Sequence, residues 1–223
     1  MCRRFTRKGK DRDLAEALNT IFPRDSPPHY NIAPSQMVAC VRSHAESTNR
    51  EYVELKWGLV PSWTKDVSIG NKMINARSET VAEKPSFRKA FKQQRCVVLA
   101  DGYYEWKREG KAKQPYYVQF KDQHMFCFAG LWERWDHGNN SPLETCAMLT
   151  IGPNAVIEPI HHRMPVILHP KDYDTWLDSS IQDPTILSSL LQPYLPEEME
   201  AHFVGPMVNN PRNDTSDCVK AWQ

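Results

Sequence analysis

A cysteine stands at the second position of the chain, directly after Met1. Removal of Met1 would leave Cys2 with a free α-amine and a thiol on adjacent carbons. Such an amine condenses with an aldehyde to an imine, and the thiolate then closes on the imine carbon to form a thiazolidine. Reference pKa values of about 7.7–8.0 for the amine and about 8.5 for the thiol leave both partly unprotonated near neutral pH. Cys2 is therefore a candidate nucleophile, although taken alone it is also simply the residue after a start methionine.

Two further residues are candidates for proton transfer. Glu105 lies between Tyr104 and Trp106, and desolvation by aromatic neighbours raises a carboxyl pKa, which suits general acid catalysis. The alternative is an exposed strand whose glutamate faces solvent. His161 precedes His162. Because adjacent residues of a strand face opposite sides, we expect no metal site within this pair, and one of the two histidines is a candidate proton-transfer group.

Polar and aromatic residues at regular spacing are candidates for binding. Asn75, Arg77 and Glu79 alternate along the chain, so they face one side if the segment is extended. Such a stripe usually faces water, and it is a site only if that face lines a cleft. Trp57 and Trp63 flank a stiff turn that contains glycine and proline. The tryptophans of this turn either pack in the hydrophobic core or provide a platform on which an unstacked base can lie.

The first ten residues form a basic arm beside Cys2. They include no acidic residue, and their basic residues are Arg3, Arg4, Arg7, Lys8 and Lys10. The arm is either a solvated end of the chain or a phosphate-contacting segment.

The elements that must position these residues are mostly strands. Strands are predicted at 37–42, 51–57, 95–100, 115–120, 125–132, 145–151 and 202–208, and the strand at 95–100 continues into 101–107. Helices are predicted at 11–22, 85–94, 171–178 and 184–191, and ordered loops at 27–35 and 138–142. In the first helix, Leu14, Leu18 and Ile21 share one face.

The order of these elements predicts the fold class. The strands 37–42 and 51–57 are expected to pair through a polar loop, and 115–120 and 125–132 to form a hairpin. Strands are mostly adjacent in the chain, with helices at the periphery and no internal repeat or domain break. We therefore expect a single domain over residues 1–223, of the α+β class, with a largely antiparallel sheet or a partly closed β-barrel.

Composition excludes several function classes. The chain has 223 residues and a net charge of +1, so nucleic-acid binding must come from a local basic patch. Its six cysteines include no C-x-x-C pair, so we expect no zinc knuckle and no redox dithiol. The even count allows a disulfide framework, but a chain of this length with a core does not need one, and no secretion signal is present. No cofactor is expected. Cys96, Cys127 and Cys146 lie in apolar runs and are expected to be buried thiols. With no signal peptide and no membrane-spanning run, a cytoplasmic location is expected.

Several motifs in order resemble one family. They are Met1–Cys2, Tyr30-Asn-Ile-Ala-Pro34, Trp57-Gly-Leu-Val-Pro-Ser-Trp63, Asn75-Ala-Arg-Ser-Glu-Thr80, Ala100-Asp-Gly-Tyr-Tyr-Glu-Trp106 and Ile160-His-His-Arg-Met-Pro165. Together they resemble the SRAP family, the SOS-response-associated peptidases, regarded as abasic-site processing proteins. The resemblance runs from residue 2 to about Asn210. Arg3 stands where the family usually has glycine, which puts the local backbone geometry in doubt.

The resemblance implies a covalent DNA–protein cross-link. Cys2 would capture the ring-opened aldehyde of an abasic site in single-stranded DNA as a thiazolidine, which shields the lesion. Glu105 would act as general acid/base, His161 would transfer protons, and Asn75 would orient the N-terminal residue and the sugar. The implied DNA contacts are Arg4, Arg77 and Arg163 to phosphates, Trp63 by stacking or wedging, and Asn31 by shaping the pocket.

The resemblance also implies partners and alternative activities. It implies a monomer that acts on single-stranded DNA with abasic sites, associates with replication-fork proteins, lies at the nucleoid in a bacterial cell, and needs no metal. The imine could instead β-eliminate, which is lyase chemistry, and the family name reflects self-processing peptidase activity. Two other functions stay open: a cysteine peptidase that uses Cys2 and His161, and a non-covalent single-stranded DNA-binding protein.

Overall fold

Five strands close into a barrel, because β10 pairs with both β4 and β9. The barrel strands are β3 (Met37–Ser43), β4 (Arg50–Trp57), β6 (Arg95–Ala100), β9 (Phe126–Trp135) and β10 (Leu143–Ile151). Short strands β5 (Asn75–Arg77), β11 (Met164–Pro165) and β12 (Ile167–Leu168) extend this sheet. The computed structural model describes residues 2–22, 26–43, 50–110, 112–136 and 141–222.

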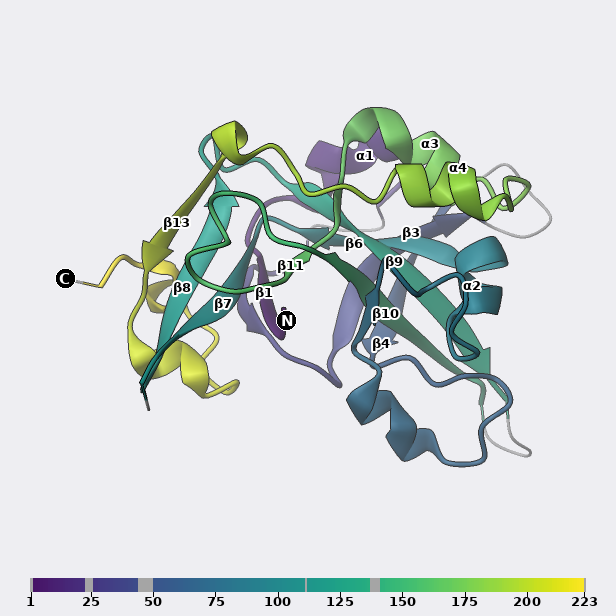
Figure 1. Cartoon of the computed structure of the whole chain (residues 1–223), viewed down its shortest axis with the longest axis horizontal. Coiled ribbons are helices and arrows are strands. Elements are labelled where there is room, and N and C mark those ends of the chain that lie inside the picture. The colour runs from purple at the N-terminus through teal and green to yellow at the C-terminus, as the bar shows by residue number, and fades with distance from the viewer. Residues whose placement is uncertain (1, 23–25, 44–49, 111, 137–140, 223) are drawn as a thin grey trace.

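A second sheet has five strands in the order β13-β8-β7-β1-β2, all antiparallel. These strands are β1 (Arg4–Arg7), β2 (His29–Ile32), β7 (Gly102–Glu109), β8 (Ala112–Phe120) and β13 (Met199–Phe203). The N-terminal strand β1 thus lies inside the sheet, between β2 and β7, near the centre of the molecule (Figure 1). A strand with neighbours on both sides has its backbone fixed by two ladders of hydrogen bonds.

The helices are short and lie at the periphery (Figure 1). The α-helices are α1 (Ala15–Leu18), α2 (Arg88–Gln93), α3 (Tyr173–Leu177) and α4 (Pro184–Ser189). The 3₁₀ turns are η1 (Asp11–Leu14), η2 (Val67–Lys72), η3 (Pro170–Asp172), η4 (Pro196–Glu198), η5 (Pro206–Asn209) and η6 (Ser216–Val219). Within the described ranges, no helix has the length and apolar character needed to cross a bilayer.

Both faces of β6 are covered, so this strand is buried along its whole length. Val97 and Leu99 pack on the helix side with Phe91 and Trp176. The alternate residues of β6 pack in a second cluster that includes Phe5 of the N-terminal strand. The core therefore connects the barrel directly to the strand that carries the N-terminus.

The α+β class and a largely antiparallel architecture are confirmed, and the barrel is closed rather than partly closed. The hairpin of β3 and β4 is also confirmed, as are the buried free thiols of Cys96, Cys127 and Cys146. The loop between β3 and β4, residues 44–49, and most of the predicted loop 138–142 lie outside the described residues.

Two predictions near the N-terminus are wrong. The helix predicted to reach residue 22 ends at Leu18, because Asn19 takes a left-handed conformation with φ of 43°. Ile21 therefore lies 89% exposed instead of packing beside Leu14 and Leu18. The proline-rich stretch predicted as a loop contains the edge strand β2, which is compatible with the prolines because Pro27 and Pro28 precede the strand and Pro34 follows it.

Two predictions about strand pairing and position are also wrong. The strands β8 and β9 do not form a hairpin, since β8 pairs with β7 and β13 while β9 belongs to the barrel. The last strand ends at Phe203, and the rest of the range predicted for it contains Pro206, which begins η5. A proline cannot donate to the ladder and is favoured at the first position of a helical turn.

Candidate functional site

The pairing of β1 with β7 places the N-terminus beside Glu105. Arg4 pairs with Tyr104 and Phe5 with Tyr103, so extending the register by one residue sets Arg3 opposite Glu105. The Asn75 side-chain amide donates to the Cys2 carbonyl oxygen at 2.7 Å. Two strands from different parts of the chain therefore hold the backbone of Cys2.

A buried carboxylate fixes the other end of β1. Asp101 is 2% exposed, and it accepts hydrogen bonds from the Thr6 hydroxyl and from the backbone N–H groups of Lys8 and Gly9. The following residue, Gly102, lies against Tyr117, whose hydroxyl would be 2.1 Å from a β-carbon at this position. The Asp-Gly pair before β7 thus has a structural explanation, since it anchors β1 and admits Tyr117.

Glu105 is 2% exposed, so the solvent-facing alternative is wrong. Desolvation raises the pKa of the Glu105 carboxyl to about 7. The sequence argument attributed this shift to Tyr104 and Trp106, but these residues project from the opposite face of β7. Tyr103, Cys2 and Arg3 interact electrostatically with Glu105.

His161 lies beside this carboxyl, with its Nδ1 3.9 Å from Glu105 Oε2. Desolvation lowers the pKa of His161 to about 4. His161 Nδ1 lies 3.1 Å from both the backbone nitrogen and the carbonyl oxygen of Arg163, so it accepts from the N–H in one tautomer and donates to the carbonyl in the other. Near neutral pH the two groups are therefore a neutral imidazole and a titrating carboxyl, rather than an ion pair.

The two histidines do not face opposite sides as a strand would require. Residues 161 and 162 lie in a loop, and their rings stack with centroids 4.3 Å apart. Both histidines line the same pocket. The premise that they diverge is wrong, because the alternation rule applies only to extended backbone.

The Cys2 thiol is buried and donates to the Arg4 carbonyl oxygen at 3.5 Å. Burial, and second the charge of Glu105, raise the pKa of the Cys2 thiol above its ordinary value. Met1 lies outside the described residues. An α-ammonium on Cys2 itself would put a positive charge beside the sulfur, and this charge lowers a thiol pKa.

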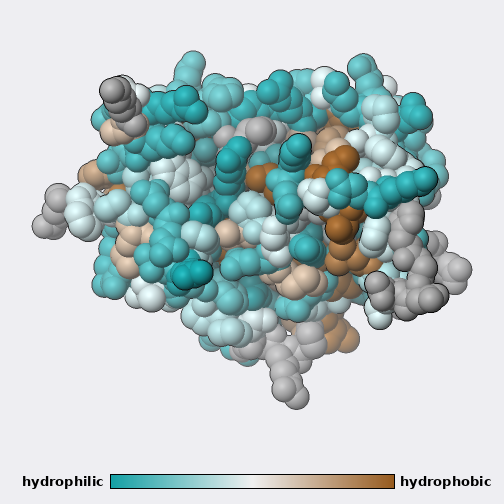
Figure 2. Space-filling view, turned by 90° about the horizontal axis from the view of Figure 1, so that it is seen from below, coloured by the Kyte–Doolittle hydropathy of each residue, from teal (hydrophilic) through white to brown (hydrophobic). Residues whose placement is uncertain are grey.

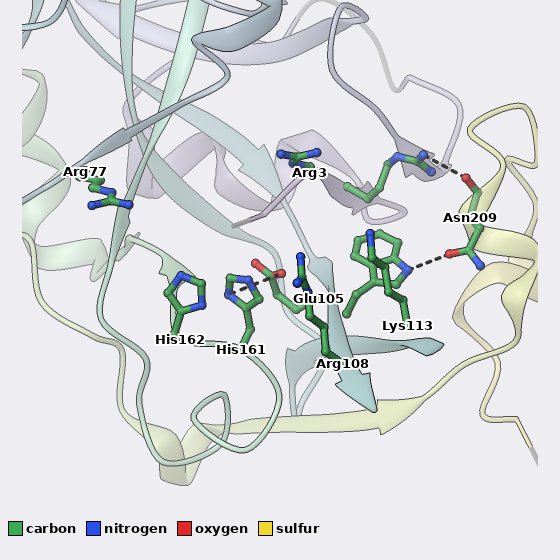
Figure 3. Close-up of a pocket in the computed structure, with 10 residues that line it drawn as sticks. Arg3, Arg77, Glu105, Arg108, Lys113, His161, His162 and Asn209 are labelled. Carbon is green, nitrogen blue, oxygen red and sulfur yellow. Dashed lines mark hydrogen bonds and ion pairs between the residues drawn. The ribbon is translucent and has the colours of Figure 1, made fainter. Parts of the chain in front are cut away.

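A pocket of about 460 Å³ opens beside these groups (Figure 3). It is lined by Arg3, Arg4, Arg77, Glu105, Trp106, Arg108, Lys113, His161, His162 and Asn209. Five of these side chains are basic and one is acidic. Because burial favours the neutral form of that single carboxyl, the pocket is strongly cationic and suits an anionic ligand.

The structure brings together Cys2, Glu105, His161, Asn75 and Arg77, but Arg4 and Asn31 have internal partners. The Arg4 guanidinium donates to Asn31 Oδ1 at 2.9 Å and to the Val208 carbonyl at 2.7 Å. The buried Asn31 amide donates to carbonyl oxygens of Val208, Asn210 and Asn213. Arg4 and Asn31 thus hold the C-terminal segment against β1 and β2.

Arg163 and Trp63 do not line this pocket. Arg163 makes a bidentate pair with Glu79, its Nη2–Oε2 distance being 2.9 Å, and also donates to the Thr150 carbonyl. Glu79 follows the end of β5, so only Asn75 and Arg77 share the predicted face of that strand. Trp63 is 61% exposed, whereas Trp57 is fully buried with its indole N–H donating to the Ile74 carbonyl.

Arg108, Lys113 and Asn209 line the pocket but were missed from the sequence. Asn209 accepts a hydrogen bond from the Trp106 indole at 2.7 Å. The signal for the two cations was the basic run from Lys107 to Lys113. Assigning it to the pocket required the β7–β8 pairing, which was not predicted.

The chain was compared with known proteins. The family model described as SOS response associated peptidase (SRAP) matches residues 1–211. The chain belongs to this family. Abasic site processing protein YoqW of Bacillus subtilis (strain 168) is 43% identical over 225 residues, covering 99% of this chain and 100% of YoqW. Abasic site processing protein HMCES of Gallus gallus is 33% identical, covering 86% of this chain and 66% of HMCES.

The fold of this SRAP protein also matches a solved structure. A protein from Bacteroides thetaiotaomicron has a TM-score of 0.85 and 27% identity, covering 100% of both chains.

Proposed function

We propose that this protein processes abasic sites in single-stranded DNA, and that Cys2 forms the covalent link once Met1 is removed. The observation that carries the proposal is the position of Cys2. Its carbonyl is held by Asn75 beside a buried carboxyl, and the adjoining pocket is cationic. The names of the relatives, abasic site processing proteins, support the same substrate.

The proposed chemistry begins with ring opening of the abasic sugar to its aldehyde. The Cys2 amine adds to the aldehyde carbon, and loss of water gives an imine. The thiol then adds across the C=N bond, forming the C–S bond while its proton moves to nitrogen. Glu105, with a pKa of about 7, is half-protonated near neutral pH, so it can both donate and accept the protons that these steps move.

Neutral His161 completes this proton relay. Its ring is held by Arg163 and lies 3.9 Å from Glu105, so it can exchange a proton with the carboxyl or with the sugar. Arg77 of β5 would contact a phosphate beside the lesion. Closure to the thiazolidine removes the imine, and therefore it competes with strand cleavage by β-elimination.

The decisive experiment is a covalent-adduct assay with the processed protein. Single-stranded oligonucleotides with and without one abasic site are incubated with protein and separated under denaturing conditions. We expect a stable adduct with the abasic strand only, and none after Cys2→Ala. Survival of the adduct in Cys2→Ala would refute Cys2 as the nucleophile, and a shift lost on denaturation would support non-covalent binding instead.

Two variants separate the steps. Cys2→Ser keeps the amine but cannot close the thiazolidine, so its imine should be trapped only by a reductant such as borohydride and should give more strand cleavage. Glu105→Gln should slow adduct formation. An unchanged rate in Glu105→Gln would remove Glu105 from the mechanism.

The peptidase alternative needs a thiolate at Cys2. Burial favours the protonated thiol in the described state, since it raises the pKa of Cys2. Cleavage of a peptide by the processed protein, lost in both Cys2→Ala and His161→Ala, would support that alternative.

A further inference from the structure

The free cations around the pocket differ from those expected from the sequence. Arg4 is bound to Asn31 and the C-terminal segment, and Arg163 is paired with Glu79. By contrast, the ion pairs among the described residues include none for Arg77, Arg108 or Lys113, whereas Arg3 interacts electrostatically with Glu105. Three positive charges without an ion pair in the described part of the chain, together with Arg3, therefore border one pocket.

Two of these cations face each other across the β7–β8 hairpin. Arg108 pairs directly with Lys113 in the strand register. Like charges at such positions repel and destabilise a sheet. The nearest carboxylate on this strand, Glu109, pairs instead with Lys107 at 3.2 Å. The hairpin thus holds two adjacent cations together without a counter-charge from the described part of the chain, which is the arrangement that an oxyanion ligand stabilises.

The cations lie on two sides of the proton-transfer pair. Figure 3 shows Arg77 beyond His162 on one side of Glu105 and His161, and Arg108 and Lys113 on the other side. Arg77 comes from β5 of the barrel sheet, whereas Arg108 and Lys113 come from the second sheet. Arg3 comes from the N-terminal segment and lines the same pocket.

We propose that Arg108 and Lys113, assisted by Arg3, form a second phosphate subsite on the side of the lesion opposite Arg77. The site would then bind the phosphodiesters on both sides of the abasic sugar. It would therefore bind an internal lesion more tightly than a lesion at the end of a strand. This inference rests on the proposed function, because it takes the sugar to lie at Glu105.

Binding to a tetrahydrofuran lesion tests the subsite without the covalent reaction, since this sugar analogue has no aldehyde. Single strands carry a neutral methylphosphonate on the 5′ side of the lesion, on the 3′ side, or on neither side. Each strand is titrated with the parent protein, with Arg108→Gln/Lys113→Gln, and with Arg77→Gln. Lys107→Gln is the matched control, because it removes a paired cation from the same strand.

For the parent we expect each neutral linkage to weaken binding about tenfold, the effect of one charge-assisted contact. The double variant Arg108→Gln/Lys113→Gln, called the hairpin variant, should bind equally well with and without the neutral linkage on one side of the lesion, and should still be weakened by the neutral linkage on the other side. Arg77→Gln should show the reverse pattern. The slope of log K, where K is the association constant, against log salt concentration should be smaller in magnitude by about 0.7 in the hairpin variant. Lys107→Gln should behave as the parent.

The subsite is refuted if the hairpin variant stays sensitive to both linkages, or if its affinity falls equally for every strand. The variant positions are exposed, so the thermal midpoint should match that of the parent, and Lys113→Gln alone provides a milder second variant. If the hairpin variant loses its sensitivity to the neutral linkage on one side only, but the parent forms no covalent adduct with abasic DNA, the subsite is supported and the proposed function is refuted. If the parent forms the adduct but the hairpin variant shows no such one-sided loss of sensitivity, the proposed function is supported and the subsite is refuted.

Discussion

At the residue scale, Glu105 and His161 are both shifted toward their neutral forms by burial. Their pKa values of about 7 and about 4 mean that neither carries a full charge at neutral pH. A carboxyl in this state is costly to the fold when it ionises, because burial has removed the water that would solvate the charged form without a full replacement. A pKa near neutrality is the property that the proposed role of Glu105 in proton transfer requires.

The cost of Glu105 predicts a pH-dependent stability difference. Its pKa rises from an ordinary 4.5 to about 7, so its contribution to stability is fully present below pH 4.5 and is lost as pH rises through 7. Glu105→Gln should match the parent at pH 4 and exceed its free energy of unfolding by up to about 3 kcal/mol at pH 8. Chemical denaturation at several pH values measures this, and a variant less stable than the parent at pH 8 would contradict it.

Substitutions of Trp57 and Trp63 should affect different properties, the first the stability of the fold and the second the binding of DNA. Trp57→Ala removes a buried ring that contacts Phe5 edge-on at 5.4 Å and should cost about 3–5 kcal/mol of stability. Trp63→Ala removes an exposed ring and should change stability by less than about 0.5 kcal/mol.

If Trp63 stacks on DNA, Trp63→Ala should weaken single-strand binding by about 1–3 kcal/mol, and Trp63→Phe should retain most of it. Fluorescence anisotropy with a labelled strand checks this. Equal affinity of Trp63→Ala and the parent would assign the ring no role in binding.

The residues most visible in the sequence were those with unusual chemistry. Cys2, Glu105 and His161 could be singled out by type and neighbours, and the structure places them together. Which cations are free could not be predicted, because pairing depends on contacts such as Arg163 with Glu79 that only the fold creates. Arg108 and Lys113 were missed for the same reason, because their position at the pocket depends on strand pairing that the fold creates.

At the element scale, the site depends on how β1 is held. Asn75 fixes one end and Asp101 fixes the other, while β2 and β7 fix the register between them. A slip of one residue would turn every side chain of β1 to the opposite face. The position of the nucleophile is therefore set by a buried carboxylate more than ninety residues away in the chain.

Asp101→Asn should weaken this anchor. The amide cannot accept all the bonds from Thr6, Lys8 and Gly9, so we expect a loss of about 3 kcal/mol in stability and slower adduct formation. Thr6→Ser is the control, since it keeps the hydroxyl. Unfolding curves and adduct rates report both effects, and a parent-like rate in a folded Asp101→Asn would show that β1 needs no such anchor.

Strands were easier to predict than their partners. Apolar runs such as residues 95–100 identify a buried strand directly. The hairpin predicted from β8 and β9 was wrong because adjacency in sequence does not show which sheet a strand joins. The edge strand β2 was missed because local proline content outweighed the pairing that β1 supplies.

At the scale of the whole molecule, charge is local rather than global. The net charge is +1, and the face in Figure 2 is mainly hydrophilic with hydrophobic residues gathered in one band. Long-range attraction to DNA is therefore weak, and affinity must come from the cations at the pocket. The fold class followed from strand content, whereas closure of the barrel depended on the long-range pairing of β10 with β4.

The salt dependence of binding should reflect this local charge. With the pocket cations contacting the two phosphates that flank the lesion, the slope of log K against log salt should be about −1.4 for single strands. Arg77→Gln should reduce its magnitude by about 0.7. Titrations at several salt concentrations give the slope, and a value near zero would refute phosphate contacts as the source of affinity.

The bonds from Arg4 to Val208 and Asn209 join the beginning of the chain to its end. A ribosome adds about 5–20 residues per second, so β1 waits on the order of 10–40 s for these partners to be synthesised. During that interval Arg4 of β1 lacks the contacts with Val208 and Asn209 that it makes in the finished protein. Translation itself thus opens a period in which an aminopeptidase can reach Met1 before folding buries Cys2.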